Sequence, residues 1–179
     1  MGRFKNILLV SGGKRNVGKT TYICKLISLH KNKAITAVKI TPHFHEITTG
    51  LQSISKGDGW ILSKETNTTQ KKDTSLYLKA GAKNSFFLQS EKEYLKEAFN
   101  ELLPFLPQDN PIIIESAGLN KIIQPELYVV VLPDGECLKK EIEPILMLAD
   151  LIVISDGKKF YPSPEKIIFD SKWKLNTSK

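Results

Sequence analysis

Residues 13–20 read GKRNVGKT, which satisfies the pattern G-x-x-x-x-G-K-[ST]. The apolar run of residues 4–10 precedes this stretch, and residues 20–30 follow it with apolar side chains at helical spacing. A buried strand, a glycine-rich turn and an amphipathic helix in this order are typical of a phosphate-binding loop, or P-loop. The stretch therefore predicts both an α/β fold and an anion site at the start of the helix.

The rest of the chain alternates in the same way between apolar runs and helical spacing. Five further runs predict strands, at residues 34–40, 85–88, 112–114, 127–132 and 151–154. Helices are expected at residues 73–81 and 138–148, and Pro144 would start a new turn within the second. This alternation predicts one domain, residues 1–179, with a doubly wound, mostly parallel sheet in a three-layer αβα arrangement of the P-loop NTPase type.

Two signals refine the boundaries of these elements. Ser90 and Glu93 have the spacing of a capping box, which predicts a helix that opens at Ser90 and ends at Pro104. The last apolar run, residues 166–169, predicts an additional edge strand.

The segment of residues 46–72 is polar and unusually long for a connection. Within it, residues 51–55 and 60–63 flank the turn sequence KGDG, which predicts a β-hairpin. Long excursions in compact domains are usually functional or disordered. We therefore expect a small inserted β-arm followed by a mobile tail, residues 65–72.

Composition limits the classes of partner. The 179-residue chain has a net charge of +7, which favours anionic partners, but no basic stripe interleaves with aromatic residues, so nucleic acid is not expected. The run of residues 7–10 is too short for a signal peptide, and no run approaches a membrane span, so we expect a cytoplasmic protein. Cys24 and Cys137 lack metal-ligand spacing and are expected to be reduced thiols.

The P-loop pattern assigns a role to each residue type. The loop amides and the helix start would surround phosphate oxygens, Lys19 would reach the β- and γ-phosphates, and the Thr20 hydroxyl would bind Mg²⁺. The residues expected to bind the nucleotide are Gly13, Lys14, Arg15, Asn16, Val17, Gly18, Lys19, Thr20, Thr21, Lys39, Asp73 and Asp156. The residues expected to act in catalysis are Lys19, Lys14 and Glu115.

A carboxylate at the end of a neighbouring strand usually completes the metal site of such enzymes. Glu115 follows the buried run of residues 112–114, so it is expected at the ligand-binding edge of the sheet and is the favoured metal ligand with Thr20. Asp73 is either a substrate or water contact or an N-cap of the helix that starts there. Lys39, at the end of its strand, is a second candidate cation at the same edge.

Three further residues have open alternatives. His43 and His45 would share a face of an extended segment beside Glu46, either as metal ligands or as surface histidines beside the ligand loop. Asp156 lies after the run of residues 151–154, where guanine-binding proteins place the Asp of an N-K-x-D motif. It is either a purine contact or a turn aspartate.

The loop itself resembles the deviant P-loop G-K-G-G-V-G-K-T of the SIMIBI class of NTPases. Lys14 stands at the position of the signature lysine of that class, and Arg15 and Asn16 replace two glycines. The resemblance implies a homodimer in which Lys14 reaches the nucleotide of the partner subunit; a solvated loop lysine is the alternative.

The segments together resemble the family of molybdopterin-guanine dinucleotide biosynthesis protein B (MobB). The similar segments are VKITPH at residues 38–43, KDT at residues 72–74 and AGA at residues 80–82, where Ile40 and Pro42 replace histidines of the family. This resemblance implies a homodimer that binds GTP, hydrolyses it slowly and assists the enzyme that attaches GMP to molybdopterin. By resemblance, Lys19, Thr20, Glu115 and Asp73 would be the functional residues.

Two other functions fit the residues. The turn ESAG at residues 115–118 is equally similar to the E-G-x-G turn of dethiobiotin synthetase and cobyrinate amidotransferase relatives. The chain could accordingly be an ATP-dependent small-molecule kinase or ligase, or a non-catalytic, nucleotide-gated adaptor. The leading expectation is slow, electrostatically catalysed hydrolysis of Mg²⁺-GTP in preference to Mg²⁺-ATP.

Overall fold

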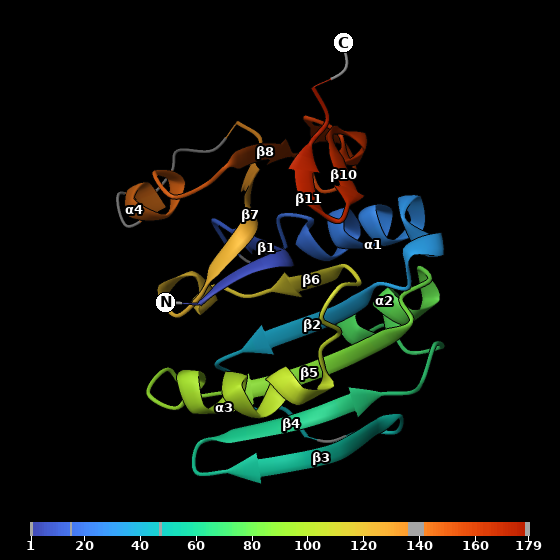
Figure 1. Ribbon diagram of the computed structural model, residues 1–179, viewed down its shortest axis with the longest axis vertical. Helices are drawn as coiled ribbons and strands as arrows, with labels where there is room; N and C mark the ends of the chain where they lie inside the picture. The colour runs from blue at the N-terminus through green and yellow to red at the C-terminus, as the bar shows by residue number, and fades with distance from the viewer. Residues whose placement is uncertain (1, 15, 47, 136–141, 178–179) are drawn as a thin grey trace.

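The computed structural model describes residues 2–14, 16–46, 48–135 and 142–177. Its centre is a nine-stranded sheet in the order β3-β4-β5-β2-β6-β1-β7-β8-β9 (Figure 1). The strands are β1 (Arg3–Gly12), β2 (Thr36–Thr41), β3 (Leu51–Gly57), β4 (Trp60–Glu65), β5 (Asn84–Ser90), β6 (Ile112–Glu115), β7 (Gln124–Pro133), β8 (Leu151–Ser155) and β9 (Phe160–Tyr161). A separate two-stranded sheet consists of β10 (Ile167–Asp170) and β11 (Lys172–Leu175).

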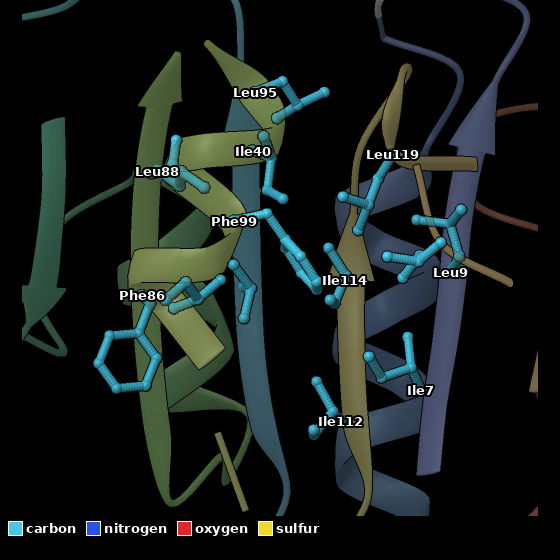
Figure 2. Close-up of a cluster of buried hydrophobic side chains, with 14 of the residues drawn as sticks. Ile7, Leu9, Ile40, Phe86, Leu88, Leu95, Phe99, Ile112, Ile114 and Leu119 are labelled. Atoms are coloured by element: carbon cyan, nitrogen blue, oxygen red, sulfur yellow. The ribbon is translucent and has the colours of Figure 1, made fainter. Parts of the chain in front are cut away.

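The six central strands, from β5 to β8, run parallel, and antiparallel strands flank them at both edges. Helices cover both faces of this parallel part, which is why its strands are apolar almost throughout. Along β1, Ile7 and Leu9 are buried on one face (Figure 2). Leu8 and Val10 are buried on the other face. The expected α/β fold with a mostly parallel sheet is confirmed.

The helices divide between the two faces. The helices α1 (Lys19–Leu29) and α2 (Asp73–Lys79) pack with Leu8 and Val10, and α3 (Leu95–Leu102) packs with Ile7 and Leu9. The short α4 (Glu143–Leu146) adds to the α3 side and has Pro144 in its first turn, as expected. Residues 136–141 lie outside the described residues. They include Cys137 and residues 138–141, which begin the helix expected at 138–148.

The expected hairpin exists as β3 and β4, but it does not stand apart from the domain as an arm. The strand β4 pairs antiparallel with β5, so the hairpin extends the main sheet. Trp60 on β4 is buried, and its indole N–H donates to Glu97 Oε1 on α3 at 2.9 Å. The expected mobile tail starts at a fixed point, because the buried Glu65 carboxylate accepts from the main-chain N–H groups of Thr66 and Asn67.

The capping box was a wrong prediction. Ser90 is the last residue of β5, where it pairs with Trp60, and α3 begins only at Leu95. The Ser90 hydroxyl donates to the Glu91 carbonyl instead of capping a helix. Strand pairing thus competes successfully with the local capping interaction.

The expected edge strand at residues 166–169 is also corrected. This run forms β10, which pairs with β11 in a hairpin of its own outside the main sheet (Figure 1). The hairpin packs on the α1 side through Trp173, which is 1% exposed. The Trp173 indole N–H donates to the carbonyls of Asn6, at 2.9 Å, and Ile112, at 3.1 Å, and this bond fixes the hairpin across β1 and β6.

Within the described residues, no helix has the length and apolar composition needed to cross a membrane.

Candidate functional site

The glycine-rich loop lies between the end of β1 at Gly12 and the start of α1 at Lys19. Gly18 precedes the helix in the left-handed region, at φ 88°. A Cβ atom there would lie 3.0 Å from Ser155 Oγ and 3.2 Å from Gly157 Cα, so both backbone conformation and space require glycine. The main-chain N–H of Gly13 donates to the Val131 carbonyl at 3.1 Å, which fixes the start of the loop to β7.

The Lys19 side chain folds back over the loop. A Cβ atom at Gly12 would lie 2.7 Å from Lys19 Cδ, so the lysine stem occupies the space that glycine leaves open. The Lys19 ammonium donates to the main-chain carbonyl of Lys14 at 2.9 Å. Burial lowers the pKa of Lys19 from its ordinary value. The ammonium is therefore held inside the loop at a point of incomplete solvation, which favours an anionic ligand.

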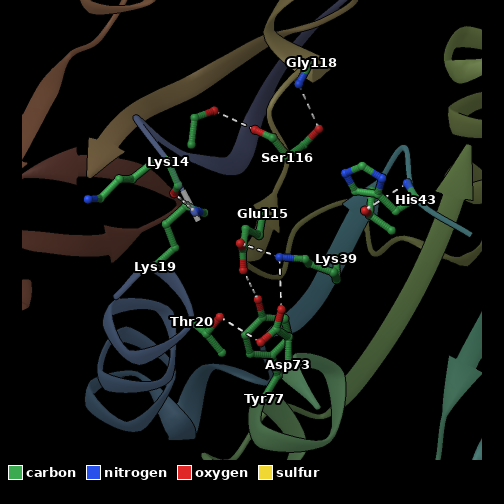
Figure 3. A network of polar contacts seen from close by, with 12 residues as sticks. Lys14, Lys19, Thr20, Lys39, His43, Asp73, Tyr77, Glu115, Ser116 and Gly118 are labelled. Atoms are coloured by element: carbon green, nitrogen blue, oxygen red, sulfur yellow. Dashed lines mark hydrogen bonds and ion pairs between the residues drawn. The ribbon is translucent and has the colours of Figure 1, made fainter. Parts of the chain in front are cut away.

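Four polar side chains converge beside Thr20 at the start of α1 (Figure 3). The Thr20 hydroxyl donates to Asp73 Oδ1 at 2.9 Å, and Lys39 Nζ lies 3.0 Å from Asp73 Oδ2. Lys39 also donates to Glu115 Oε1 at 2.5 Å, and the Tyr77 hydroxyl donates to Glu115 Oε2 at 2.5 Å. The helix α1 is thus connected to α2 and to the ends of β2 and β6 by one polar network.

Strand register explains why these residues meet. Glu115 is the register partner of both Val10 on β1 and Lys39 on β2. Val10 faces the α1 and α2 side, so Glu115 and Lys39 also face that side at the carboxyl ends of their strands. Open α/β sheets bind their ligands at this edge.

Burial and the charges within the network shift the pKa values of Lys39 and Tyr77. Although burial lowers the pKa of Lys39, the charges of Glu115 and Asp73 outweigh it and raise that pKa above the ordinary value. Burial, followed by the charge of Glu115, raises the pKa of Tyr77 well above the ordinary value, so the phenol stays protonated and donates. Glu115, with 3% of its side chain exposed, consequently has a donor on each oxygen.

A second group of hydrogen bonds supports the loop from the other side. The Ser11 hydroxyl donates to the Ser116 carbonyl at 2.6 Å and accepts from the Tyr128 hydroxyl at 3.0 Å (Figure 3 shows the Ser116 end). The Ser116 main-chain N–H donates to the Val10 carbonyl at 3.1 Å. These bonds hold the end of β1 and the turn after β6 in a fixed relative position.

A cleft of about 510 Å³ lies over the helix start, and we call it the main cleft. Its lining residues are Asn16, Gly18, Lys19, Thr20, Thr21, Lys39, Thr41, His43, His45, Asp73, Glu115 and Gly157. The volume is in the range of small-molecule sites. The structure therefore brings most residues predicted from the sequence to one cavity.

Other predicted residues lie elsewhere. Lys14 is exposed, and Figure 3 shows its side chain directed away from Glu115. Asp156 is exposed and accepts from the main-chain N–H groups of Lys158 and Lys159, at 2.8 and 2.7 Å. These bonds are those of a turn aspartate, the second of its two alternatives. Val17 is buried under the loop, Gly13 is exposed at its start, and Arg15 lies outside the described residues.

The histidines and the candidate metal ligands all line the main cleft. His43 and His45 both line the main cleft and are exposed. Among the described residues, no three His, Cys, Asp or Glu side chains form a group that could hold a metal ion by themselves. The Thr20 hydroxyl and the Asp73 carboxylate, 2.9 Å apart, are oxygen donors of the kind that Mg²⁺ prefers, and few protein ligands suffice where phosphates supply others. The donor set fits Mg²⁺, with Asp73 rather than Glu115 adjacent to Thr20.

Tyr77 belongs to the polar network but is not among the residues predicted from the sequence. It lies four residues after Asp73 on α2, and this spacing places the two side chains on one helix face. That spacing was the available signal, because it predicts that Tyr77 shares whatever site Asp73 faces.

Comparison with protein-family models, with curated proteins and with solved structures finds no match to this chain.

Proposed function

We propose that this protein binds a nucleoside triphosphate with Mg²⁺ in the main cleft and hydrolyses it slowly. The observation that carries the proposal is the position of Lys19 and Thr20 at the start of α1, directly after a glycine-containing loop and against Asp73. A strand, a loop and a helix arranged in this way present amides, an ammonium group and a hydroxyl to a phosphate chain. These features support the proposal of a P-loop NTPase.

Each residue of the network has a separate task in this proposal. The amides at the start of α1 and the Lys19 ammonium bind phosphate oxygens, and Lys19 exchanges its bond to the Lys14 carbonyl for them. Thr20 and Asp73 hold Mg²⁺ or its waters, and Glu115 keeps Lys39 oriented toward Asp73. When bound, Mg²⁺ supplies positive charge that offsets the charge developing on the phosphate oxygens.

Slow hydrolysis follows from the groups that surround the cleft. Arginine side chains that stabilise the transition state accelerate such reactions by roughly 10³- to 10⁵-fold. In the described part of the chain the only arginine is Arg3, which lies at the amino end of β1 and pairs with Glu126. Arg15, within the loop, lies outside the described residues; among the groups that the structure does describe, Lys19 and the loop amides would stabilise the transferred phosphoryl group.

The resemblance to the MobB family extends the proposal to a biological role. On that basis the protein is a homodimeric accessory factor for a partner enzyme in molybdenum cofactor biosynthesis, and it prefers GTP to ATP. The exposed position of Lys14 is compatible with a contact to a partner subunit. The guanine preference rests on the resemblance, because the Asp156 carboxylate is engaged within its own turn.

Isothermal titration of the full chain with GTP, ATP and GDP, each with Mg²⁺ and with EDTA, tests the proposal. Saturable, Mg²⁺-dependent binding of a triphosphate is expected, with slow phosphate release in a parallel assay. Absence of binding for every nucleotide would overturn the proposal, and equal affinity for GTP and ATP would overturn the guanine preference alone.

A second candidate function is transfer of the γ-phosphoryl group to a small acceptor. The observation that favours it is a smaller cavity, of about 250 Å³, which shares Lys39, Thr41, His45 and Asp73 with the main cleft. Phosphate release that rises only when a small metabolite is added supports transfer, whereas release that rises only with a partner protein supports the accessory role.

A further inference from the structure

The smaller cavity, which we call the side chamber, has features that phosphate binding does not explain. Besides the four residues shared with the main cleft, its lining residues are Leu51, Lys72, Thr74 and Phe87. Leu51 belongs to β3, so the inserted hairpin closes the chamber on one side. The chamber is therefore a product of this chain's long segment between β2 and α2.

Strand register places an aromatic ring beside the charged network. Phe87 on β5 is the register partner of Lys39 on β2, which is in turn the partner of Glu115 on β6. The three side chains therefore belong to one row across the same face of the sheet. A ligand that lies on Phe87 would reach Lys39 with one end.

Aromatic and aliphatic groups form the apolar wall of the chamber. The His45 and Phe87 rings lie 6.2 Å apart, with an interplanar angle of 31°. Leu51 is buried, and Phe87 is partly exposed to the cavity. Rings in this relation offer faces on which a flat apolar group stacks.

The charged wall has two cations and one carboxylate. Lys72 lines the chamber and donates through its ammonium to Thr48 Oγ1 at 2.5 Å, and the Lys39 ammonium lies between Asp73 and Glu115. Among the residues that the structure describes, Asp73 is the only acidic one that lines the chamber. Since Asp73 already pairs with Lys39, Lys72 is the group best placed to accept an anion.

We propose that the side chamber binds a small ring compound that carries a carboxylate or phosphate group, next to the nucleotide, as a second substrate. The ring lies on Phe87 and His45, and the anionic group faces Lys72. The role as a second substrate rests on the proposed nucleotide site and on the second candidate function, phosphoryl transfer, whereas the binding itself does not.

Phenyl phosphate is a suitable probe, because it combines one ring with one phosphate. It is titrated into the full chain by calorimetry or NMR, with inorganic phosphate and phenol as the separate halves of the molecule. We expect saturable binding with a Kd below about 10 mM and an affinity about tenfold higher than that of either half. Absence of saturable binding in this range would overturn the inference.

Variants determine where the probe binds. Lys72→Met is expected to weaken phenyl phosphate binding about tenfold, and Phe87→Leu and His45→Ala about threefold to tenfold. His45 is exposed, so its variant remains informative if substitution of Phe87 impairs folding. The exposed Lys121→Met serves as the control and should bind within about twofold of the wild type.

The opposite pattern would contradict the inference. If Lys19→Ala abolishes binding and the three chamber variants do not change it, the probe binds the glycine-rich loop and the side chamber is not its site. Nucleotide titrations of the same proteins separate the two proposals. Nucleotide binding without phenyl phosphate binding would remove only the chamber, and phenyl phosphate binding without nucleotide binding would remove only the nucleotide site.

Discussion

Lys39 on β2 and Glu115 on β6 are register partners, and the Lys39 ammonium donates to Glu115 Oε1 at 2.5 Å. The pair lies at the carboxyl edge of the sheet, with Asp73 on the other side of the ammonium. Glu115 therefore already pairs with the Lys39 ammonium and accepts a hydrogen bond from the Tyr77 hydroxyl. This relationship moves the proposed metal-binding role from Glu115 to Asp73, which faces the Thr20 hydroxyl.

The first prediction concerns that metal-binding role. Asp73→Asn removes the charge opposite Thr20 and is expected to weaken Mg²⁺ binding to the nucleotide complex about tenfold or more. Glu115→Gln leaves the Thr20 hydroxyl and the Asp73 carboxylate in place and should have a smaller effect. Mg²⁺ titrations of nucleotide binding measure both variants, and a larger loss for Glu115→Gln than for Asp73→Asn would contradict the assignment.

The second prediction concerns the hydrogen bond from Tyr77 to Glu115. Tyr77→Phe leaves one oxygen of a buried carboxylate without its donor, which should lower the free energy of unfolding by about 1.5–3 kcal/mol. Tyr161→Phe is the matched control, because Tyr161 is 80% exposed and should change stability by less than about 0.5 kcal/mol. Urea denaturation compares the two. Equal stability of both variants would show that the Tyr77 bond contributes nothing.

The third prediction concerns stability at high pH. Lys39 and Tyr77 have pKa values raised above their ordinary values of 10.5 and 10.0. A group with a raised pKa in the folded state stabilises the fold fully below the unfolded pKa and loses this contribution as pH rises through the folded pKa. Burial also raises the pKa of Cys24 to about 11, which has the same sign, whereas the lowered pKa of Lys19 has the opposite sign.

The free energy of unfolding is therefore expected to fall above about pH 10. Urea denaturation at steps between pH 8 and pH 11 measures this dependence. Lys39→Met should reduce the slope while lowering stability at every pH, because it leaves Glu115 without its cation. A free energy of unfolding that rises from pH 10 to pH 11 would contradict the account.

The fourth prediction concerns the C-terminal hairpin. Trp173→Ala removes a buried ring and both of its hydrogen bonds, and it should cost about 3–5 kcal/mol. Lys172→Ala removes only a half-exposed ion pair with Glu126 and should cost less than about 1 kcal/mol. Unfolding midpoints decide between these values; similar midpoints for the two variants would mean that the hairpin is not an integral part of the fold.

The hydrophobic pattern of the sequence predicts the elements whose formation depends mainly on neighbouring residues. The run before residue 13 and the helical spacing after residue 20 determine β1 and α1, because buried strands and amphipathic helices differ in period. The position of Glu115 also followed from sequence, since it ends a buried run at the ligand-binding edge.

The remaining features depend on contacts between distant segments. Ser90 satisfies a capping pattern, but its pairing with Trp60 from the inserted hairpin makes it a strand residue. Residues 166–169 are apolar enough for a sheet edge, yet Trp173 fixes them across β1 and β6, on the α1 side of the sheet. Asp73 fits both an N-cap and a site residue, and only the placement of α2 against Thr20 distinguishes them. The spacing of residues within one strand or helix does not predict these contacts between distant segments.

The central claim, that the Lys19 ammonium and the loop before it bind a triphosphate, is tested most directly by comparing Lys19→Ala with Lys33→Ala. Lys33 is an exposed lysine beyond the other end of α1, so its variant changes the net charge equally. Calorimetric titration with Mg²⁺ and a non-hydrolysable GTP analogue should show a loss of more than tenfold in affinity for Lys19→Ala and less than about twofold for Lys33→Ala. An unchanged affinity and an unchanged Mg²⁺ dependence in Lys19→Ala would contradict the account.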